Sequence, residues 1–181
     1  TAVMSLMEHL VGLGHRPIAH IGGDRSSGVS RERSEAFLLA VEHFNFRLDE
    51  CPLRFSDWAL DQARTTARQL LEFSEPPTAI LCVNDTIAAC VLQVANELNL
   101  KVPSELSVVG ITNEHMSQLT VPSLTTVAIP CEEIGHTGML ALIDLIESKR
   151  EIATQEITRY PCTPIFRDSS AAARSLLKAT R

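Results

Sequence analysis

Apolar and polar residues alternate along the chain with two different periods, and the period changes several times. Apolar residues recur every three or four positions over residues 3–13, and Gly14 follows as a helix stop. A short apolar run, IAHIGG (18–23), comes after Pro17 and is typical of a strand. The chain is therefore predicted to begin with a helix that leads into a strand.

The same two periods continue along the rest of the chain. The further predicted strands are 51–56, 78–83, 106–111 and 124–129, and the further predicted helices are 30–44, 58–73, 86–98 and 131–148. Ser30, Asp57 and Asp85 are the predicted N-caps of the first three of these helices. Residues 152–167 alternate as a strand does, and residues 168–181 resemble a polar, alanine-rich end that frays.

Strands that alternate with helices are joined by crossovers, and this arrangement makes the strands parallel. The run TAILCV (78–83) is apolar throughout, as expected for a strand covered on both faces. The predicted fold class is therefore α/β, with a doubly wound, mostly parallel sheet. Ligands bind such sheets beyond the carboxyl ends of the strands, which directs attention to residues 22–33, 57–58, 83–85 and 111–113.

Composition narrows the class of protein. The chain has 181 residues, 45% of them hydrophobic and 21% charged, which fits one globular domain. Its net charge is −6 and its basic residues are scattered, so this segment alone should bind DNA poorly. No apolar run approaches the roughly 20 residues that span a membrane. Five widely spaced cysteines without zinc spacing indicate reduced thiols in a cytoplasmic protein.

Three side chains near the predicted strand ends could contact a ligand. Arg33 is either a solvated surface residue or a planar donor for ligand hydroxyls or a carboxylate. Trp58, the only tryptophan, either fills the core or stacks on a sugar or a purine. If Asp85 caps the following helix, the Asn84 amide is free to face a ligand.

Motifs for catalysis and for cofactors are missing from the sequence. The loop GGDRSSG (22–28) matches neither common phosphate-binding pattern, so a flexible crossover is favoured there. The chain contains no GxSxG or HExxH motif, and its six histidines lack metal-ligand spacing. We therefore expect neither an enzyme, nor a metal site, nor a cofactor.

Five ordered strings resemble the lactose/galactose-repressor (LacI/GalR) family of bacterial regulators. They are HLVGLGHRPIAHIGG (9–23), RERSEAF (31–37), PTAILCVNDTIA (77–88), VPSELSVVGI (102–111) and VPSLTTVAIPCEEIG (121–135). Together they cover nearly the whole chain. The resemblance implies a periplasmic-binding-protein-like (type I) sensor core of two α/β lobes, with an effector between them.

By this resemblance the chain is a partial sensor domain over residues 1–167. It would comprise mainly the C-terminal lobe, with pieces of the N-terminal lobe at about 1–14 and 126–150. Residues 168–181 would form a flexible tail. The family's helix-turn-helix headpiece and most of the first lobe would precede Thr1.

The resemblance also assigns roles to five residues. Arg33, Trp58 and Asn84 fall on the family's effector-contacting arginine, stacking aromatic and asparagine, and Asp57 precedes the aromatic as in the family. Thr112 occupies the position where the family usually has an aspartate, so a carboxylate acceptor has become a hydroxyl. Ile129 likewise replaces a residue that is often polar. These departures favour an effector other than a plain hexose.

The implied protein is a homodimeric, cytoplasmic repressor. A small effector (a sugar, nucleoside or related metabolite) would allosterically control binding of operator DNA by the absent headpiece. The main alternative is the periplasmic sugar-binding protein of a transporter, which shares the two-lobed core. An α/β enzyme is the more distant alternative.

Overall fold

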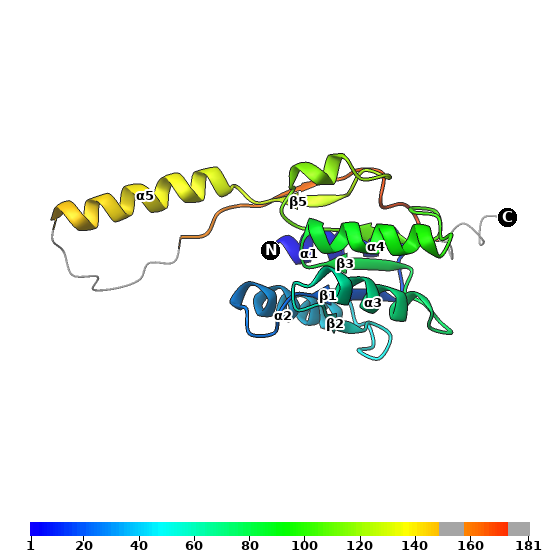
Figure 1. Ribbon diagram of the computed structural model, residues 1–181. Helices are drawn as coiled ribbons and strands as arrows, with labels where there is room; N and C mark the ends of the chain where they lie inside the picture. Colours follow the sequence, from blue (N-terminus) through cyan, green and yellow to red (C-terminus); the bar gives the residue numbers. More distant parts are fainter. Residues whose placement is uncertain (149–157, 174–181) are drawn as a thin grey trace.

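The computed structural model describes residues 1–148 and 158–173. Its main sheet has four parallel strands in the order β2-β1-β3-β4 (Figure 1). These are β1 (Ile18–Gly22), β2 (Leu53–Phe55), β3 (Ala79–Cys82) and β4 (Ser107–Val109). The predicted doubly wound α/β sheet is therefore confirmed. The strand order changes direction between β1 and β3, because β2 lies on one side of β1 while β3 and β4 lie on the other.

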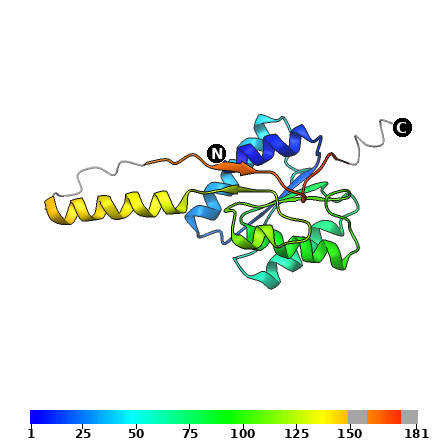
Figure 2. The same ribbon diagram turned by 90° about the horizontal axis from the view of Figure 1, so that it is seen from above.

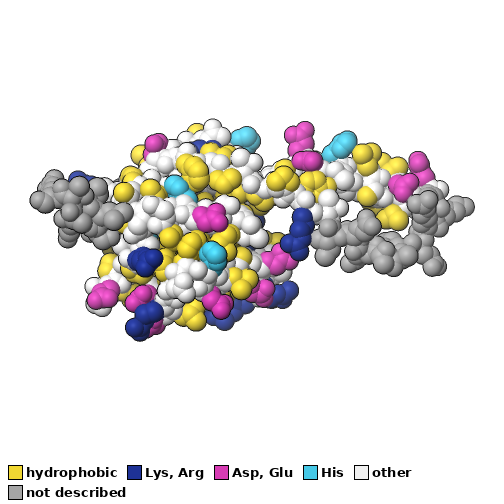
Figure 3. Space-filling view, turned by 180° about the vertical axis from the view of Figure 1, so that it is seen from behind, with side chains coloured by type: hydrophobic (Ala, Val, Ile, Leu, Met, Phe, Trp, Pro, Cys, Tyr) yellow, Lys and Arg dark blue, Asp and Glu magenta, His cyan; other side chains and the backbone are white. Residues whose placement is uncertain are grey.

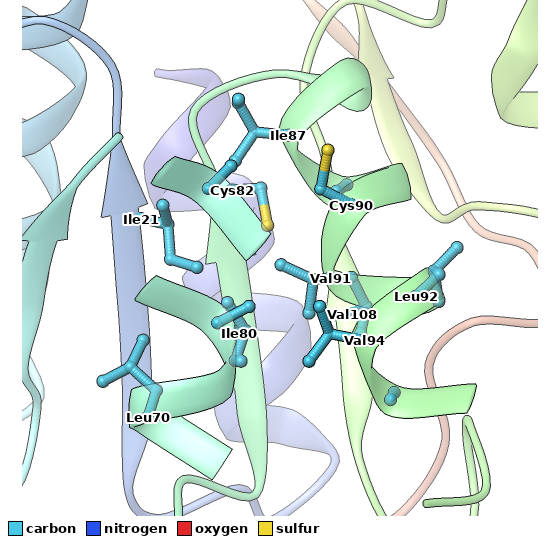
Figure 4. Close-up of a cluster of buried hydrophobic side chains, with 14 of the residues drawn as sticks. Ile21, Leu70, Ile80, Cys82, Ile87, Cys90, Val91, Leu92, Val94 and Val108 are labelled. Carbon is cyan, nitrogen blue, oxygen red and sulfur yellow. The ribbon is translucent and has the colours of Figure 1, made fainter. Parts of the chain in front are cut away.

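Helices cover both faces of this sheet and bury two apolar clusters. Helices α1 (Ala2–Gly12) and α2 (Gly28–His43) lie on one face, and α3 (Leu60–Leu71) and α4 (Asp85–Glu97) lie on the other (Figure 2). Side chains of α3 and α4 meet those of the strands in the second cluster (Figure 4). Most of the periodic apolar residues of these helices are buried against the sheet, whereas Leu38 of α2 and Leu60 of α3 are exposed.

The predicted N-caps are wrong at all three helices. Helix α2 begins after Ser27, and Ser30 lies inside the helix on its buried face. Helix α3 begins only at Leu60, because Asp57 and its neighbour have positive φ angles that a helix cannot contain. Helix α4 is capped by Asn84, whose side chain accepts a hydrogen bond from the backbone N–H of Ile87.

Two further strands and a long helix follow the main sheet. Strand β5 (Thr126–Ala128) bridges to residues at the end of β4 and pairs antiparallel with β6 (Thr163–Ile165). A short 3₁₀ helix, η1 (His115–Gln118), precedes β5. Helix α5 (Cys131–Ser148) has the predicted bounds and projects away from the sheet (Figures 1 and 2). Residues 149–157, which include the first part of the predicted strand 152–167, lie outside the described residues.

The apolar side chains of α5 are exposed. Figure 3 shows hydrophobic side chains along the helix, beside acidic ones. The exposed large ones are Ile134, Met139, Leu140, Leu142, Ile143 and Ile146. Within residues 1–148 and 158–173 no helix is long and apolar enough to cross a membrane.

Residues 168–173 differ from the fraying end expected for them. The Val108 N–H donates to the carbonyl of Ser169 over 2.8 Å, and the Ala173 N–H donates to the carbonyl of Leu13 over 2.9 Å. Both donations anchor the segment between β4 and the end of α1. Helix α1, which was expected among the pieces of the other lobe, packs against this sheet with Leu6, among others, buried. Residues 174–181 lie outside the described residues.

Candidate functional site

The five predicted site residues all lie near the carboxyl edge of the main sheet. Asp57 and Trp58 follow β2, Asn84 follows β3, and Thr112 follows β4. Arg33 reaches this edge from the second turn of α2. Among the described residues no hydrogen bond joins any two of these five side chains, so they share an edge without forming a direct network.

Arg33 is held at the end of β3. Its Nη1 donates to the carbonyl oxygen of Val83 over 2.5 Å, directly beside Asn84. Burial lowers the pKa of the Arg33 guanidinium, and nearby Cys162 and Asp85 partly oppose that shift. One nitrogen is thus used for orientation, while the planar group keeps further N–H donors for a ligand.

The Trp58 ring packs against Gly23 in the loop 22–28. A Cβ on Gly23 would come within 2.5 Å of the Trp58 ring, so the ring can take this position only because residue 23 lacks a side chain. Trp58 is 37% exposed, which leaves part of the residue open to a ligand. Asp57 does not cap α3, and its Oδ2 instead accepts a hydrogen bond from Gln62 over 3.1 Å.

The Gly23→Ala variant should displace the indole ring. Since Trp58 is the only tryptophan, its emission spectrum reports this ring alone. We expect the emission of Gly23→Ala to shift, because the new methyl group overlaps the ring. Gly28→Ala, at the first residue of α2, is the matched control, since nothing lies within 4 Å of a Cβ there. Identical spectra for both variants would show that the ring does not rest on Gly23.

Asn84 takes the capping role predicted for Asp85, whereas Asp85 lies buried inside the protein. With the Asn84 Oδ1 used as the cap, only its amide nitrogen remains to donate to a ligand. Asp85 is fully buried and accepts from the Thr126 hydroxyl over 2.6 Å and from the Glu114 N–H over 2.8 Å. Burial raises the pKa of the Asp85 carboxyl, although these two hydrogen bonds oppose the shift. Asp85 therefore ties α4 to the end of the sheet.

Glu114 places a carboxylate beside Thr112. The Thr112 hydroxyl donates to Glu114 Oε1 over 3.2 Å, and the Thr86 hydroxyl donates to its Oε2 over 3.1 Å. Thr112 itself has a φ of 122°, which a β-branched residue rarely adopts. Glu114 therefore supplies a carboxylate acceptor at this edge, two residues after Thr112, which stands where the resembling family usually has an aspartate.

A hollow of about 680 Å³ lies at the opposite edge, before the first residues of β1, β2 and β3. It contains arginines and carboxylates together, and Arg47 pairs with Asp49 over 2.6 Å. This mixture provides no single charge for a ligand, so the carboxyl edge remains the candidate site. Among the described residues no group of three or more His, Cys, Asp or Glu could hold a metal ion.

Sequence reasoning missed Asp85, Glu114 and Gly110 as residues that shape this edge. A Cβ on Gly110 would lie 2.3 Å from Asp85 Oδ1, so the glycine admits the buried carboxylate. The pair of residues Asn84 and Asp85 carried a signal, since either side chain can cap a helix. Glu114 carried little signal, because one acidic residue in a polar loop is ordinary.

Comparison with known proteins gives a consistent result. The model of the family described as Periplasmic binding protein-like domain matches residues 7–170. The HTH-type transcriptional repressor CytR of Escherichia coli (strain K12) is 30% identical over 172 residues, covering 95% of this chain and 50% of CytR. PurR of Yersinia enterocolitica is 35% identical over 143 residues, covering 79% of this chain and 42% of PurR. The chain spans about half the length of the curated relatives it matches.

Solved structures agree with these sequence relatives. A lac repressor dimer bound to operator and the anti-inducer ONPF has a TM-score of 0.85 and 27% identity, over 94% of this chain and 58% of that one. A LacI family transcriptional regulator from Enterococcus faecium with bound ribose has a TM-score of 0.84 and 25% identity, over 96% of this chain and 63% of that one.

Proposed function

The chain belongs to the periplasmic binding protein-like domain family, in the form found in LacI-family regulators, and we propose that it senses a small hydroxyl-rich effector for a transcriptional repressor. The single observation that carries the ligand site is the placement of Arg33 and Trp58 at one edge of the sheet. Arg33 supplies directed donors and Trp58 supplies a flat apolar face. Sugars and nucleosides need both of these features.

The polar groups at this edge indicate the kind of ligand. Arg33 and the Asn84 amide nitrogen are donors, and Glu114 is an acceptor next to Thr112. Ligand hydroxyls both donate and accept, so they can pair with all of these groups. Ribose, which is bound in the Enterococcus faecium relative, is therefore the first molecule to test.

A second lobe is needed to enclose the ligand. The carboxyl edge forms one wall, and α5 leaves the sheet on this side with its apolar side chains exposed (Figure 1). We assign the opposite wall to a lobe that packs on α5 and covers those side chains. Closure of the two lobes on the effector would then change the arrangement that contacts DNA. The effector can shift the equilibrium between the two arrangements only by the difference in its affinity for them.

The DNA-binding and assembly roles are proposed from the relatives. CytR and PurR are HTH-type repressors, and a lac repressor is a dimer on its operator. We propose that this chain likewise acts as a cytoplasmic dimer whose operator contacts come from a helix-turn-helix segment. The repressor relatives favour this function over the binding protein of a transporter, and over an enzyme.

The Arg33→Ala and Trp58→Ala variants should each bind ribose, or the hexose or nucleoside that the protein prefers, about 10- to 100-fold more weakly. This range corresponds to the loss of charge-assisted hydrogen bonds or of ring stacking. Isothermal titration calorimetry measures the affinity directly. Arg31→Ala is the matched control, since Arg31 is exposed two residues away on the same helix. Unchanged affinity in both site variants would contradict the site assignment.

A further inference from the structure

Three buried polar atoms on the α2 side of the sheet have no hydrogen-bond partner among the described residues. They are His20 Nε2, Ser30 Oγ and Ser34 Oγ. His20 and Ser30 are fully buried, and Ser34 is 5% exposed. An unpaired polar group in the interior is destabilising, so three of them at one interface require an explanation.

The three atoms belong to one interface, between β1 and α2. The His20 ring stacks on Phe37 of α2, with 5.1 Å between the ring centroids. Ser34 lies one turn before Phe37, and its Oγ would be 3.1 Å from a Cβ on Gly22. Gly22 and His20 face the same side of β1, because side chains two residues apart in a strand point the same way. The Ser34 hydroxyl and the His20 ring are therefore neighbours, and Ser30 lies one turn closer to the carboxyl edge.

The hydrogen-bonding capacity of these groups is complementary. His20 Nδ1 lies 2.8 Å from the carbonyl oxygen of Leu81, and a carbonyl can only accept, so Nδ1 carries the proton. Burial lowers the pKa of His20 to about 4, so the ring is neutral near pH 7 and Nε2 is an acceptor. Each serine hydroxyl supplies one donor and accepting lone pairs.

We propose that His20 Nε2 and Ser34 Oγ bind an internal water molecule between β1 and α2, in a site that extends along the helix towards Ser30. The water donates one hydrogen to Nε2 and accepts the Ser34 hydroxyl proton, so both groups are satisfied. Buried waters in proteins typically make about three such bonds, so this water has capacity for a further partner.

The site has a consequence for the arginine described above. Arg33 lies between Ser30 and Ser34 on α2, and the water links these turns to β1. This link fixes the first turns of α2 against the sheet. It thereby fixes the backbone position from which the Arg33 side chain extends. This positioning role rests on the proposed function, whereas the water site itself does not.

High-resolution crystallography of the purified wild-type protein tests the site without any substitution. We expect electron density for a water within about 3.2 Å of both His20 Nε2 and Ser34 Oγ. Serine hydroxyls bonded only to helix carbonyls, with no density beside Nε2 in maps that resolve other buried waters, would overturn the proposal.

A double-mutant cycle gives a second test in solution. His20→Phe keeps a ring against Phe37, and Ser34→Ala removes only the hydroxyl. Each single variant should lower the melting temperature by a few degrees, and the double variant should lose less than the sum, since both partners of the water are then gone. Strictly additive shifts would overturn the shared water. Ribose affinity of Ser34→Ala tests the positioning role separately, because a loss of the water without a change in affinity rejects that role alone.

Discussion

The Asp85→Ala variant should lose about 3 kcal/mol of unfolding free energy. This carboxylate is fully buried and accepts two hydrogen bonds, one from the Thr126 hydroxyl and one from the Glu114 N–H. Alanine leaves both donors without an acceptor, and each charge-assisted bond is worth about 1.5–3 kcal/mol. The raised pKa of Asp85 shows that burial disfavours its charged form, which offsets part of the stabilisation from the two hydrogen bonds. We therefore expect a loss at the lower end of their summed range. Urea denaturation measures the loss.

Asp49→Ala is the matched control for this prediction. Asp49 also accepts two hydrogen bonds, both from Arg47, but it lies exposed on the surface. Solvent screens such a pair and water replaces the lost bonds, so the denaturation midpoint should hardly move. Equal losses in Asp49→Ala and Asp85→Ala would show that burial does not set the value of the Asp85 interactions.

Stability should fall by about 3 kcal/mol as the pH drops from 6.5 to 4, through His20. Burial lowers its pKa from 6.5 to about 4 in the folded protein. Between these pH values His20 is protonated in the unfolded chain but neutral in the folded protein. Its contribution to the free energy of unfolding is therefore complete above pH 6.5 and is lost as the pH falls towards 4. The slope is about 1.4 kcal/mol per pH unit. His9 and His15, whose pKa values burial also lowers, act in the same direction.

Denaturation at a series of pH values checks this prediction. His20→Phe should flatten the pH profile, whereas His115→Phe, at an exposed position, should leave it unchanged. Asp85 acts in the opposite sense, because its raised pKa means that stability is lost as the pH rises through it. A pH profile as steep in His20→Phe as in the wild type would contradict the role of the buried imidazole.

The periodic apolar pattern predicted the fold well because burial against a sheet imposes it. Each predicted helix and strand of the main sheet exists within a few residues of its expected bounds, and α5 matches fully. The starts of the helices were harder to predict, since serine, aspartate and asparagine are nearly equivalent as caps. Asp85 is instead used by Thr126 and Glu114, both of which are far away in the sequence.

The site was predictable only as far as strand ends could be located. Arg33 and Trp58 follow β1 and β2 in sequence, so their arrival at the same edge follows from parallel topology. Trp58 contacts Gly23 where Asp57 and Trp58 have positive φ angles. The sequence pattern does not predict such angles at residues other than glycine. The burial of Ser169 was not predicted, because a segment rich in serine and alanine resembles a loose loop. In the structure its hydroxyl donates a hydrogen bond to the carbonyl of Val108.

The pairing of residues 169–173 with early parts of the chain bears on how the protein folds during synthesis. Ala173 bonds to Leu13, and the carbonyl of Ala171 accepts from His15. These contacts join positions separated by most of the sequence, so their loop-closure entropy is among the highest in the domain. The sheet and its helices can form while the ribosome is still translating, but the outer side of β4 and the end of α1 stay unsealed until residue 173 emerges. Chaperones would therefore meet this domain with one edge open until residue 173 has been translated.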